Sequence, residues 1–338
     1  MKDFLLKKDI QISAKRYFID AMGAMAYGLF ATLLVGTIFK TIGEEFNIYF
    51  LKDVVWPVAN QATGPAIALA IAYSLRAPQL VLFSSAVVGM ASYQLGGPLG
   101  VFLATIIAVE FGKMVAGETR VDIVVTPIVT VLVGVVLAQI IGPSVQQIMR
   151  WIGEIIMLST NENPFVMGIV VAVIVGMVLT LPISSAALCL MLELDGLAAG
   201  AATIGCCAQM IGFATISFRD NGLKGVLAQG LGTSMLQVPN IYKNWKIWIP
   251  PTLASAVIGP IAIIYFKMEN TALESGMGSC GLVGQIGTFN AMKSTYGTTY
   301  ILTSILLLQF VAPAAISYLI YAIMKKKNWI KEGDLKLS

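Results

Sequence analysis

The sequence predicts an all-α polytopic membrane protein of about ten transmembrane helices, some broken and some forming re-entrant hairpins. Hydrophobic residues make up 57% of its 338 residues and charged residues only 12%. Apolar runs of about 20 residues, the length of a bilayer crossing, follow one another from Phe18 to Met324. Proline, glycine and isolated carboxylates interrupt these runs. Such breaks are tolerated at membrane depth only where the backbone is buried in protein or lines a cavity, which favours a transport function.

Hydropathy places the spans in order along the chain. Glu193–Gly196 interrupts the long apolar stretch from Pro182 to Phe218. That stretch therefore reads as a short element, Ser184–Leu194, and a full-length one, Leu197–Phe218. The remaining spans are Phe18–Phe39, Trp56–Leu75, Gln79–Gln94, Pro98–Gly112, Ile123–Ile141, Pro164–Leu181, Ile247–Phe266 and Tyr300–Met324.

Basic residues indicate the orientation, because Lys and Arg accumulate on the cytoplasmic side. Ten crossings with a cytoplasmic N-terminus place 17 of the 22 basic residues inside. An odd number would put either the basic head or the Lys325–Lys327 cluster outside. We therefore expect both termini to be cytoplasmic, with residues 1–17 as a head, 18–324 as one transport domain and 325–338 as a basic tail. No cleavable signal peptide is visible in the head.

Two loops do not read as solvated segments. The middle of Arg219–Lys246 is apolar and uncharged, and Met268–Gly297 is rich in glycine. We interpret both as re-entrant hairpins that present backbone polar groups to a cavity. The matching order of spans and Gly/Pro breaks also suggests two parallel repeats, 56–143 and 164–266.

Polar groups at these breaks are the candidates for a solute site. Ser184 and Ser185 follow Pro182, and Ser184 or Ser185 could cap a half-helix whose positive end favours an anionic or hydroxyl-rich ligand. Neutral donors and acceptors suit a polyol, although helix–helix hydrogen bonding explains any single one equally well. We expect the solute near mid-depth, between these serines, the break at Glu193 and the 276–290 segment. The full set of candidates is Ser184, Ser185, Glu193, Asp195, Gln209, Ser279, Gln285, Thr288, Asn290, Asn60 and Glu110.

Glu110 has two interpretations. A carboxylate within an apolar span is costly unless it is paired, protonated or facing water, so it could bind substrate or carry a proton. Alternatively, Glu110 lies within a turn of the inner surface, near Lys113.

Composition excludes several chemistries. The chain has no histidine, which removes the usual proton shuttle, metal ligand and carrier of phosphohistidine. The four cysteines lack metal or redox spacing and read as small buried hydrophobic residues. No nucleotide-binding or nucleophile motif occurs, and the net charge of +4 is not arranged for nucleic acid. No catalytic residue, cofactor or metal is expected.

Two runs of residues resemble a known family. Asn163–Gly168 (NPFVMG) and Gly176–Ala187 (GMVLTLPISSAA), with the glycine-rich segment 276–287, are similar to divergent EIIC-type membrane proteins of the bacterial sugar phosphotransferase system. That group includes toxin-regulator (PfoR-like) membrane proteins.

The resemblance implies a homodimeric permease of the bacterial inner membrane that passes a sugar inward while a cytoplasmic EIIB partner phosphorylates it. Better-known members carry a histidine and a glutamate beside the sugar; the nearest analogue here is Asn161-Glu162-Asn163-Pro164. Phosphoryl transfer would need separate EIIA and EIIB proteins. A small-xxx-small pair, Ala24 and Gly28, could serve a dimer contact or pack within the subunit. The alternative function is a membrane-embedded ligand sensor without coupled phosphorylation.

Overall fold

The computed structural model describes residues 2–11, 13–160 and 163–337, and these residues form helices and no strand apart from one isolated bridge. The chain divides into two compact units, with the boundary after Ile148. Residues Asn161 and Glu162, the nearest match to the family's glutamate motif, lie outside the described residues. The all-α prediction is confirmed.

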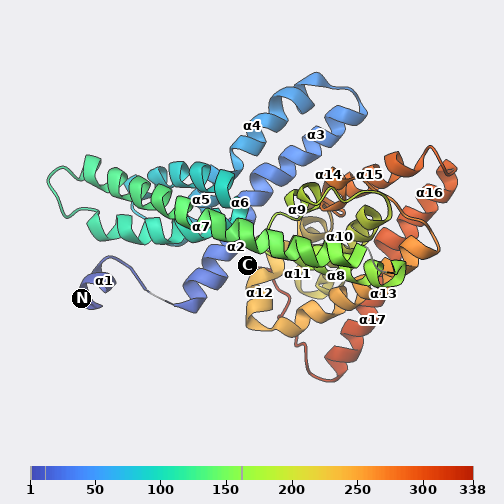
Figure 1. Ribbon diagram of the computed structural model, residues 1–338. Helices are drawn as coiled ribbons and strands as arrows, with labels where there is room; N and C mark the ends of the chain where they lie inside the picture. Colours follow the sequence, from blue (N-terminus) through green and yellow to red (C-terminus); the bar gives the residue numbers. More distant parts are fainter. Residues whose placement is uncertain (1, 12, 161–162, 338) are drawn as a thin grey trace. The chain divides into compact units, whose positions relative to one another are not determined.

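The first unit begins with a short amphipathic helix and continues as a long helix with two π-helical stretches (Figure 1). The next span is broken at Ala62, where its two halves meet at an angle of 40°. Gly28 lies against the backbone of Ala66 and Ile67, so this member of the small-residue pair packs within the subunit. The elements are α1 (Lys2–Lys7), η1 (Arg16–Ala21), α2 (Met22–Leu29), η2 (Phe30–Leu34), α3 (Val35–Glu45), η3 (Phe50–Val55), α4 (Trp56–Gln61), α5 (Thr63–Ser74), α6 (Gln79–Val115) and α7 (Asp122–Thr160), which continues into the second unit.

Helix α6 is an antiparallel hairpin of two arms. Gly97 has φ +55° and ψ −155°, a conformation open to glycine, and Pro98 follows it. The chain reverses there, so that Gly112 of the second arm lies against Val81 of the first. Each arm is roughly 27 Å long at 1.5 Å per residue. The two predicted spans on either side of Gly96-Gly97-Pro98 are therefore present as separate arms.

The number of spans is lower than the predicted value. Among the described residues, six helices are long and apolar enough to cross a membrane, or seven if the bent pair Phe50–Gln61 and Thr63–Ser74 counts as one span. That count takes both arms of α6 together and leaves out Pro164–Thr180, which has 17 residues. A further difference concerns α7, which was expected to end at Ile141. It continues through Pro143 to Thr160, because a membrane helix can absorb an internal proline.

The second unit is built around α10, which is almost entirely buried (Figure 1). Asn163 caps α8 by accepting a hydrogen bond from Phe165 N at 2.9 Å, and Pro164 occupies the first helical position. The elements are α8 (Pro164–Thr180), α9 (Ser185–Met191), α10 (Gly196–Ile216), α11 (Phe218–Leu227), η4 (Ala228–Gly232), η5 (Ser234–Gln237), α12 (Val238–Lys243), η6 (Trp245–Trp248), α13 (Ile249–Ile264), α14 (Ala272–Ser275), η7 (Cys280–Leu282), α15 (Val283–Met292), α16 (Thr298–Ile305), η8 (Leu306–Val311) and α17 (Ala312–Lys326).

Glycines allow α8, α10 and α13 to pack backbone against backbone. A Cβ atom on Gly205 of α10 would overlap the carbonyl oxygen of Ala172 in α8. A Cβ atom on Gly168 of α8 would likewise lie only 2.7 Å from the backbone of Pro260 in α13. Such close approach by small residues is the usual way in which membrane helices associate without a hydrophobic driving force. The three helices therefore form the rigid centre of this unit.

The basic tail is folded back onto the unit. Ile330 and Leu335 are 1% and 0% exposed. The carbonyl oxygen of Leu335 accepts hydrogen bonds from Asn221 Nδ2 at 2.8 Å and Gln237 Nε2 at 3.0 Å. The tail thus covers the base of the segment 218–248. This packing was not anticipated from the sequence, where the tail is dominated by lysine.

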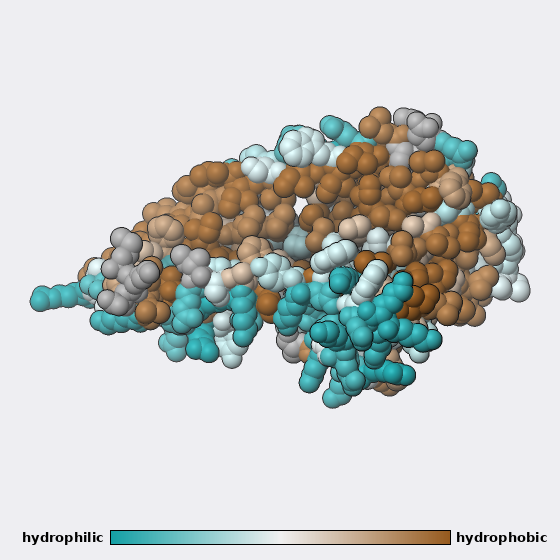
Figure 2. Space-filling model, turned by 90° about the horizontal axis from the view of Figure 1, so that it is seen from below, coloured by the Kyte–Doolittle hydropathy of each residue, from teal (hydrophilic) through white to brown (hydrophobic). Residues whose placement is uncertain are grey.

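Apolar side chains cover broad areas of the surface, as expected for a protein in lipid. Figure 2 shows brown residues over most of the face that it draws, with teal residues gathered in patches at its margin. Exposed large apolar side chains include Ile123, Leu132 and Ile140 along α7, each at least 60% exposed. A soluble monomer rarely exposes so much apolar surface.

Candidate functional site

The two predicted re-entrant hairpins meet beside the second half of α10. The first, residues 218–248, brings Gly230 close to Ala214. The second, residues 268–297, starts at a backbone bridge between Asn270 and Gly196 and reaches Cys206 with Gly278. The tips touch, because Ser279 Oγ donates a hydrogen bond to the Gly230 carbonyl at 2.5 Å. Two hairpins that present irregular backbone to one buried point are a feature of transporters.

A hydrogen-bond network surrounds Gln209 next to the first tip. The Gln209 side chain is fully buried. Its Oε1 accepts from Trp248 Nε1 at 2.9 Å and from Thr180 Oγ1 at 3.3 Å, while its Nε2 donates to Thr252 Oγ1 at 3.1 Å. Thr180 Oγ1 also lies 2.8 Å from Ser234 Oγ of the first hairpin. The network therefore joins α8, α10, α13 and the hairpin through one side chain.

A second network orders the other hairpin around Asn270. Asn270 Nδ2 donates to Thr203 Oγ1 at 2.7 Å and to the Gly284 carbonyl at 3.0 Å. Thr288 Oγ1 accepts from Asn270 at 3.4 Å and from Gln309 Nε2 at 2.9 Å. All of these side chains are buried, so the descending and returning parts of the hairpin are fixed to α10 and to each other.

Two buried amide oxygens, one in this hairpin and one on η8 beside it, have no donor among the described residues. Gln285 is 7% exposed, and its Nε2 donates to Cys207 Sγ at 3.3 Å, but its Oε1 has no hydrogen-bond partner among the described residues. Gln309 Oε1 is also without a partner in the described part of the chain. Gln285 and Thr288 are three residues apart on α15 and share a helix face, and Gln309 is bonded to Thr288. One unused amide oxygen therefore lies on α15, at Gln285, and the other lies on η8, at Gln309.

The structure brings some of the predicted site residues together. Ser184 caps α9 by accepting from Ala187 N at 3.2 Å, and Ser185 Oγ donates to the Gly276 carbonyl at 2.6 Å. The break at Glu193–Gly196 adjoins the start of the second hairpin through the Gly196–Asn270 bridge. The predicted convergence of these three segments is therefore present in the backbone, although their role in binding stays a prediction.

Other candidates lie away from these tips or point to the surface. Glu193, Asp195 and Asn290 are exposed, and Asn290 Oδ1 accepts from Lys293 Nζ at 2.9 Å. Asn60 is exposed on α4 in the first unit. The four cysteines are free and buried, as the sequence indicated.

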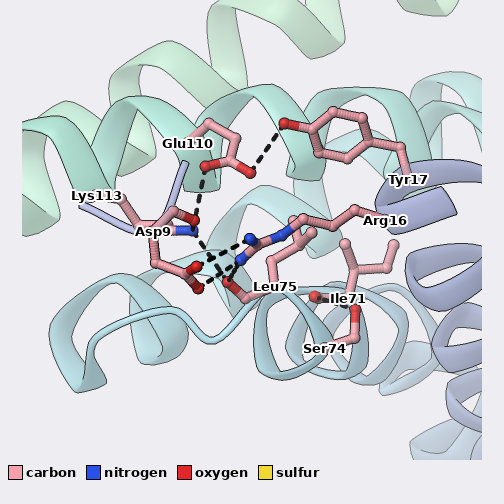
Figure 3. Close-up of polar contacts among 8 residues, drawn as sticks. All are labelled: Asp9, Arg16, Tyr17, Ile71, Ser74, Leu75, Glu110 and Lys113. Carbon is pink, nitrogen blue, oxygen red and sulfur yellow. Dashed lines mark hydrogen bonds and ion pairs between the residues drawn. The ribbon is translucent and has the colours of Figure 1, made fainter. Parts of the chain in front are cut away.

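Glu110 belongs to a charged cluster in the first unit (Figure 3). Its Oε1 accepts a hydrogen bond from Tyr17 Oη at 3.1 Å. Its Oε2 forms an ion pair with Lys113 Nζ at 3.3 Å, without the geometry of a hydrogen bond. Lys113 Nζ donates to the carbonyls of Asp9 at 2.6 Å and Leu75 at 3.0 Å. These contacts support the interfacial interpretation of Glu110. Its role in binding substrate or a proton stays untested.

Asp9 and Arg16 complete this cluster outside the apolar part of the hairpin (Figure 3). Arg16 donates to both carboxylate oxygens of Asp9, at 3.1 and 2.7 Å. This hydrogen bonding holds the pKa of the Asp9 carboxyl below its ordinary value of 3.8. The cluster therefore ties the N-terminal head to the ends of α5 and α6.

Several residues of the two networks were not singled out from the sequence. Thr180 stands directly before the Leu181–Pro182 break, and Asn270 lies three residues after Lys267, whose φ is +49°. Gln309 offered the clearest signal, because it is an amide in the middle of a long apolar span, where polar side chains commonly mark an interior contact. Trp248 gave no signal of its own, because it lies at the start of a predicted span.

The fold and these networks define a class: a multi-span helical membrane protein with opposed hairpins whose tips meet at buried polar side chains. The family described as "Phosphotransferase system, EIIC" matches residues 19–337. The match covers nearly the whole chain, so the chain belongs to this family and the resemblance seen in the sequence is confirmed. Neither a curated protein nor a solved structure matched the chain.

Proposed function

We propose that the chain is the permease component of a phosphotransferase system and carries a small polyhydroxylated solute, a sugar or a related compound, across the bacterial inner membrane. Family membership supports a membrane component of such a system. The solute class rests on the chemistry of the hairpin tips, where amides and hydroxyls predominate. Such groups suit a neutral polyol better than a charged solute.

The observation that carries this proposal is the unused acceptor at Gln285. An amide oxygen buried without a donor costs roughly 1–3 kcal/mol. A hydroxyl of a bound sugar would supply the missing donor, so binding would recover part of this cost. The nearby Gln309 Oε1 offers a second acceptor, and a solute with several hydroxyls could use both.

Movement past the site requires the hairpin tips to separate. The Ser279–Gly230 hydrogen bond joins two irregular segments. The helices behind it are held by glycine contacts and buried networks. We propose that the tips open while α8, α10 and α13 stay fixed, and that a cytoplasmic EIIB-type partner supplies the phosphoryl group. A homodimer and cytoplasmic termini are part of the same proposal.

Uptake of a panel of labelled sugars tests the proposal. Cells lacking their own sugar permeases should accumulate at least one sugar when they express the chain together with EIIA and EIIB proteins encoded near it. Omitting EIIB should abolish the accumulation of phosphorylated sugar. If a sugar binds the purified chain but no member of the panel enters cells or proteoliposomes, the sensor alternative replaces transport.

A further inference from the structure

A pocket of about 440 Å³ lies in the second unit between α11 and α17. Its walls are apolar or aromatic: Ile216 at the end of α10, Leu223 and Val226 on α11, and Tyr318 and Tyr321 on α17. The volume falls within the ~300–1,000 Å³ range of small-molecule sites. The pocket is separate from the hairpin tips and takes no part in the proposed transport site.

The rim of the pocket is cationic. Arg219 lines it, is exposed, and has no hydrogen bond or ion pair among the described residues. Lys325 Nζ lies 5.7 Å from the centre of the Tyr321 ring, which places a second cation at the same wall. The neighbouring carboxylate of Asp220 is directed to the tail, where it accepts from Gly333 N at 3.4 Å and Leu335 N at 3.3 Å. The charge left for a ligand is therefore positive.

Apolar exposure around the pocket indicates that it adjoins lipid. Leu223 is 68% exposed and Leu227 is 51% exposed on α11, while Leu319 and Ile323 are 62% and 57% exposed on α17. Arg219 and Lys224 lie on α11 with Leu223 and Leu227, and Gly222 breaks this short helix after Arg219. A helix that combines exposed apolar residues with basic ones is suited to the boundary between headgroups and acyl chains.

We propose that this pocket binds an anionic phospholipid, with an acyl chain against Leu223 and Tyr318 and the phosphate at Arg219. An apolar chamber with an unpaired guanidinium at its rim complements an apolar tail with an anionic head. Arginine recognises phosphate through two parallel hydrogen bonds. In a zwitterionic headgroup the lipid's own ammonium group offsets the charge of the phosphate, so the attraction to arginine is weaker. Basic residues at the cytoplasmic surface are also attracted by anionic lipids in general.

The site adjoins the base of the first hairpin. Ser217 lies between the pocket residues Ile216 and Phe218, and its Oγ accepts from Gln229 Nε2 at 2.7 Å. Gln229 directly precedes Gly230, whose carbonyl holds the second tip. A lipid bound between α11 and α17 therefore contacts and stabilises the start of the first hairpin, next to Ser217.

Native mass spectrometry of the full chain, released from detergent with graded amounts of lipid, tests the proposal. Phosphatidylglycerol should bind about tenfold more tightly than phosphatidylcholine of the same chain length. Arg219→Gln should remove that preference, whereas Lys267→Gln, at an exposed cation that follows α13 and does not line the pocket, should keep it. Val226→Trp should fill the pocket and weaken both lipids. Circular dichroism and a thermal melt confirm that each variant is folded.

Three results would overturn the assignment. Equal affinity for both lipids would show that the rim does not select charge. An unchanged preference in Arg219→Gln would place the anion elsewhere. Efficient disulfide crosslinking between two copies of Leu223→Cys, independent of added phosphatidylglycerol, would make a second copy of the chain the occupant of this face.

Discussion

The charged cluster of the first unit makes a quantitative prediction about Lys113. This side chain is 2% exposed and that of Glu110 is 12% exposed, so the pair is largely removed from water. Replacing Lys113 with Met leaves a buried carboxylate whose remaining hydrogen bond comes from Tyr17. Removing one partner of a buried ion pair costs ~3–5 kcal/mol.

The reciprocal change should cost less. In Glu110→Gln, Lys113 keeps its hydrogen bonds to the carbonyls of Asp9 and Leu75, and Tyr17 can donate to the new amide oxygen. We expect a loss of ~1–3 kcal/mol, set by hydrogen bonds that involve a charged group. The double variant Glu110→Gln/Lys113→Met removes the unpaired charge and should be ~2 kcal/mol more stable than Lys113→Met alone.

Unfolding in mixed detergent micelles measures this ordering. The four proteins should rank, from most to least stable, as wild type, Glu110→Gln, the double variant and Lys113→Met. Lys40→Met, a partly exposed cation whose partner Glu44 is exposed, serves as a control and should change stability by less than ~1 kcal/mol. Additive losses in the double variant would show that Glu110 and Lys113 do not depend on each other, and the structural role of Glu110 would be wrong.

Three further predictions concern packing, pH and the tail. Gly205→Ala should destabilise the second unit by ~1–3 kcal/mol or prevent its folding, since the added Cβ meets a carbonyl, whereas Gly297→Ala, with nothing within 4 Å, should be neutral in a thermal melt. The pKa of the Asp9 carboxyl is lowered in the folded state, so its ion pair with Arg16 stabilises the head above about pH 3.8 and this stabilisation is lost as the pH falls through the lower folded pKa. Hydrogen exchange of the head, measured as a function of pH, should show this loss. An unchanged pH profile in Arg16→Gln would contradict it. Removing the residues after Lys327 should expose the 218–248 segment to protease, and equal cleavage with and without the tail would refute its covering role.

Glycine and proline residues that interrupt the apolar runs made part of the fold predictable from the sequence. Gly97 needs a positive φ and is followed by proline, so the reversal in α6 could be read from two residues. The two hairpins were predictable because their middle parts are apolar and uncharged, and such segments are more stable buried in protein than in water. Pro143 misled the same reasoning, since a proline within a membrane helix need not end it.

The hydrogen-bond networks were harder to predict from the sequence, because they depend on partners that are distant along the chain. Gln209 was a candidate, but its contacts come from two other spans, with Thr180 on α8 and both Trp248 and Thr252 on the span Trp245–Ile264. The docking of Leu335 likewise requires Asn221 and Gln237, which lie about 100 residues earlier. Composition marks such residues as polar or apolar, but only the packing shows which of them meet.

Equilibrium binding of the transported sugar to purified Gln285→Met tests the central claim most directly. Methionine keeps the length of the side chain and removes the buried acceptor, so folding should persist while affinity for the sugar falls about tenfold, as expected for one lost hydrogen bond of ~1.5 kcal/mol. Ser294→Ala, an exposed polar residue just after the same helix that is not a candidate for binding, is the control and should bind as the wild type does. Unchanged affinity in a folded Gln285→Met protein, or an equal loss in both variants, would contradict a solute site at the hairpin tips.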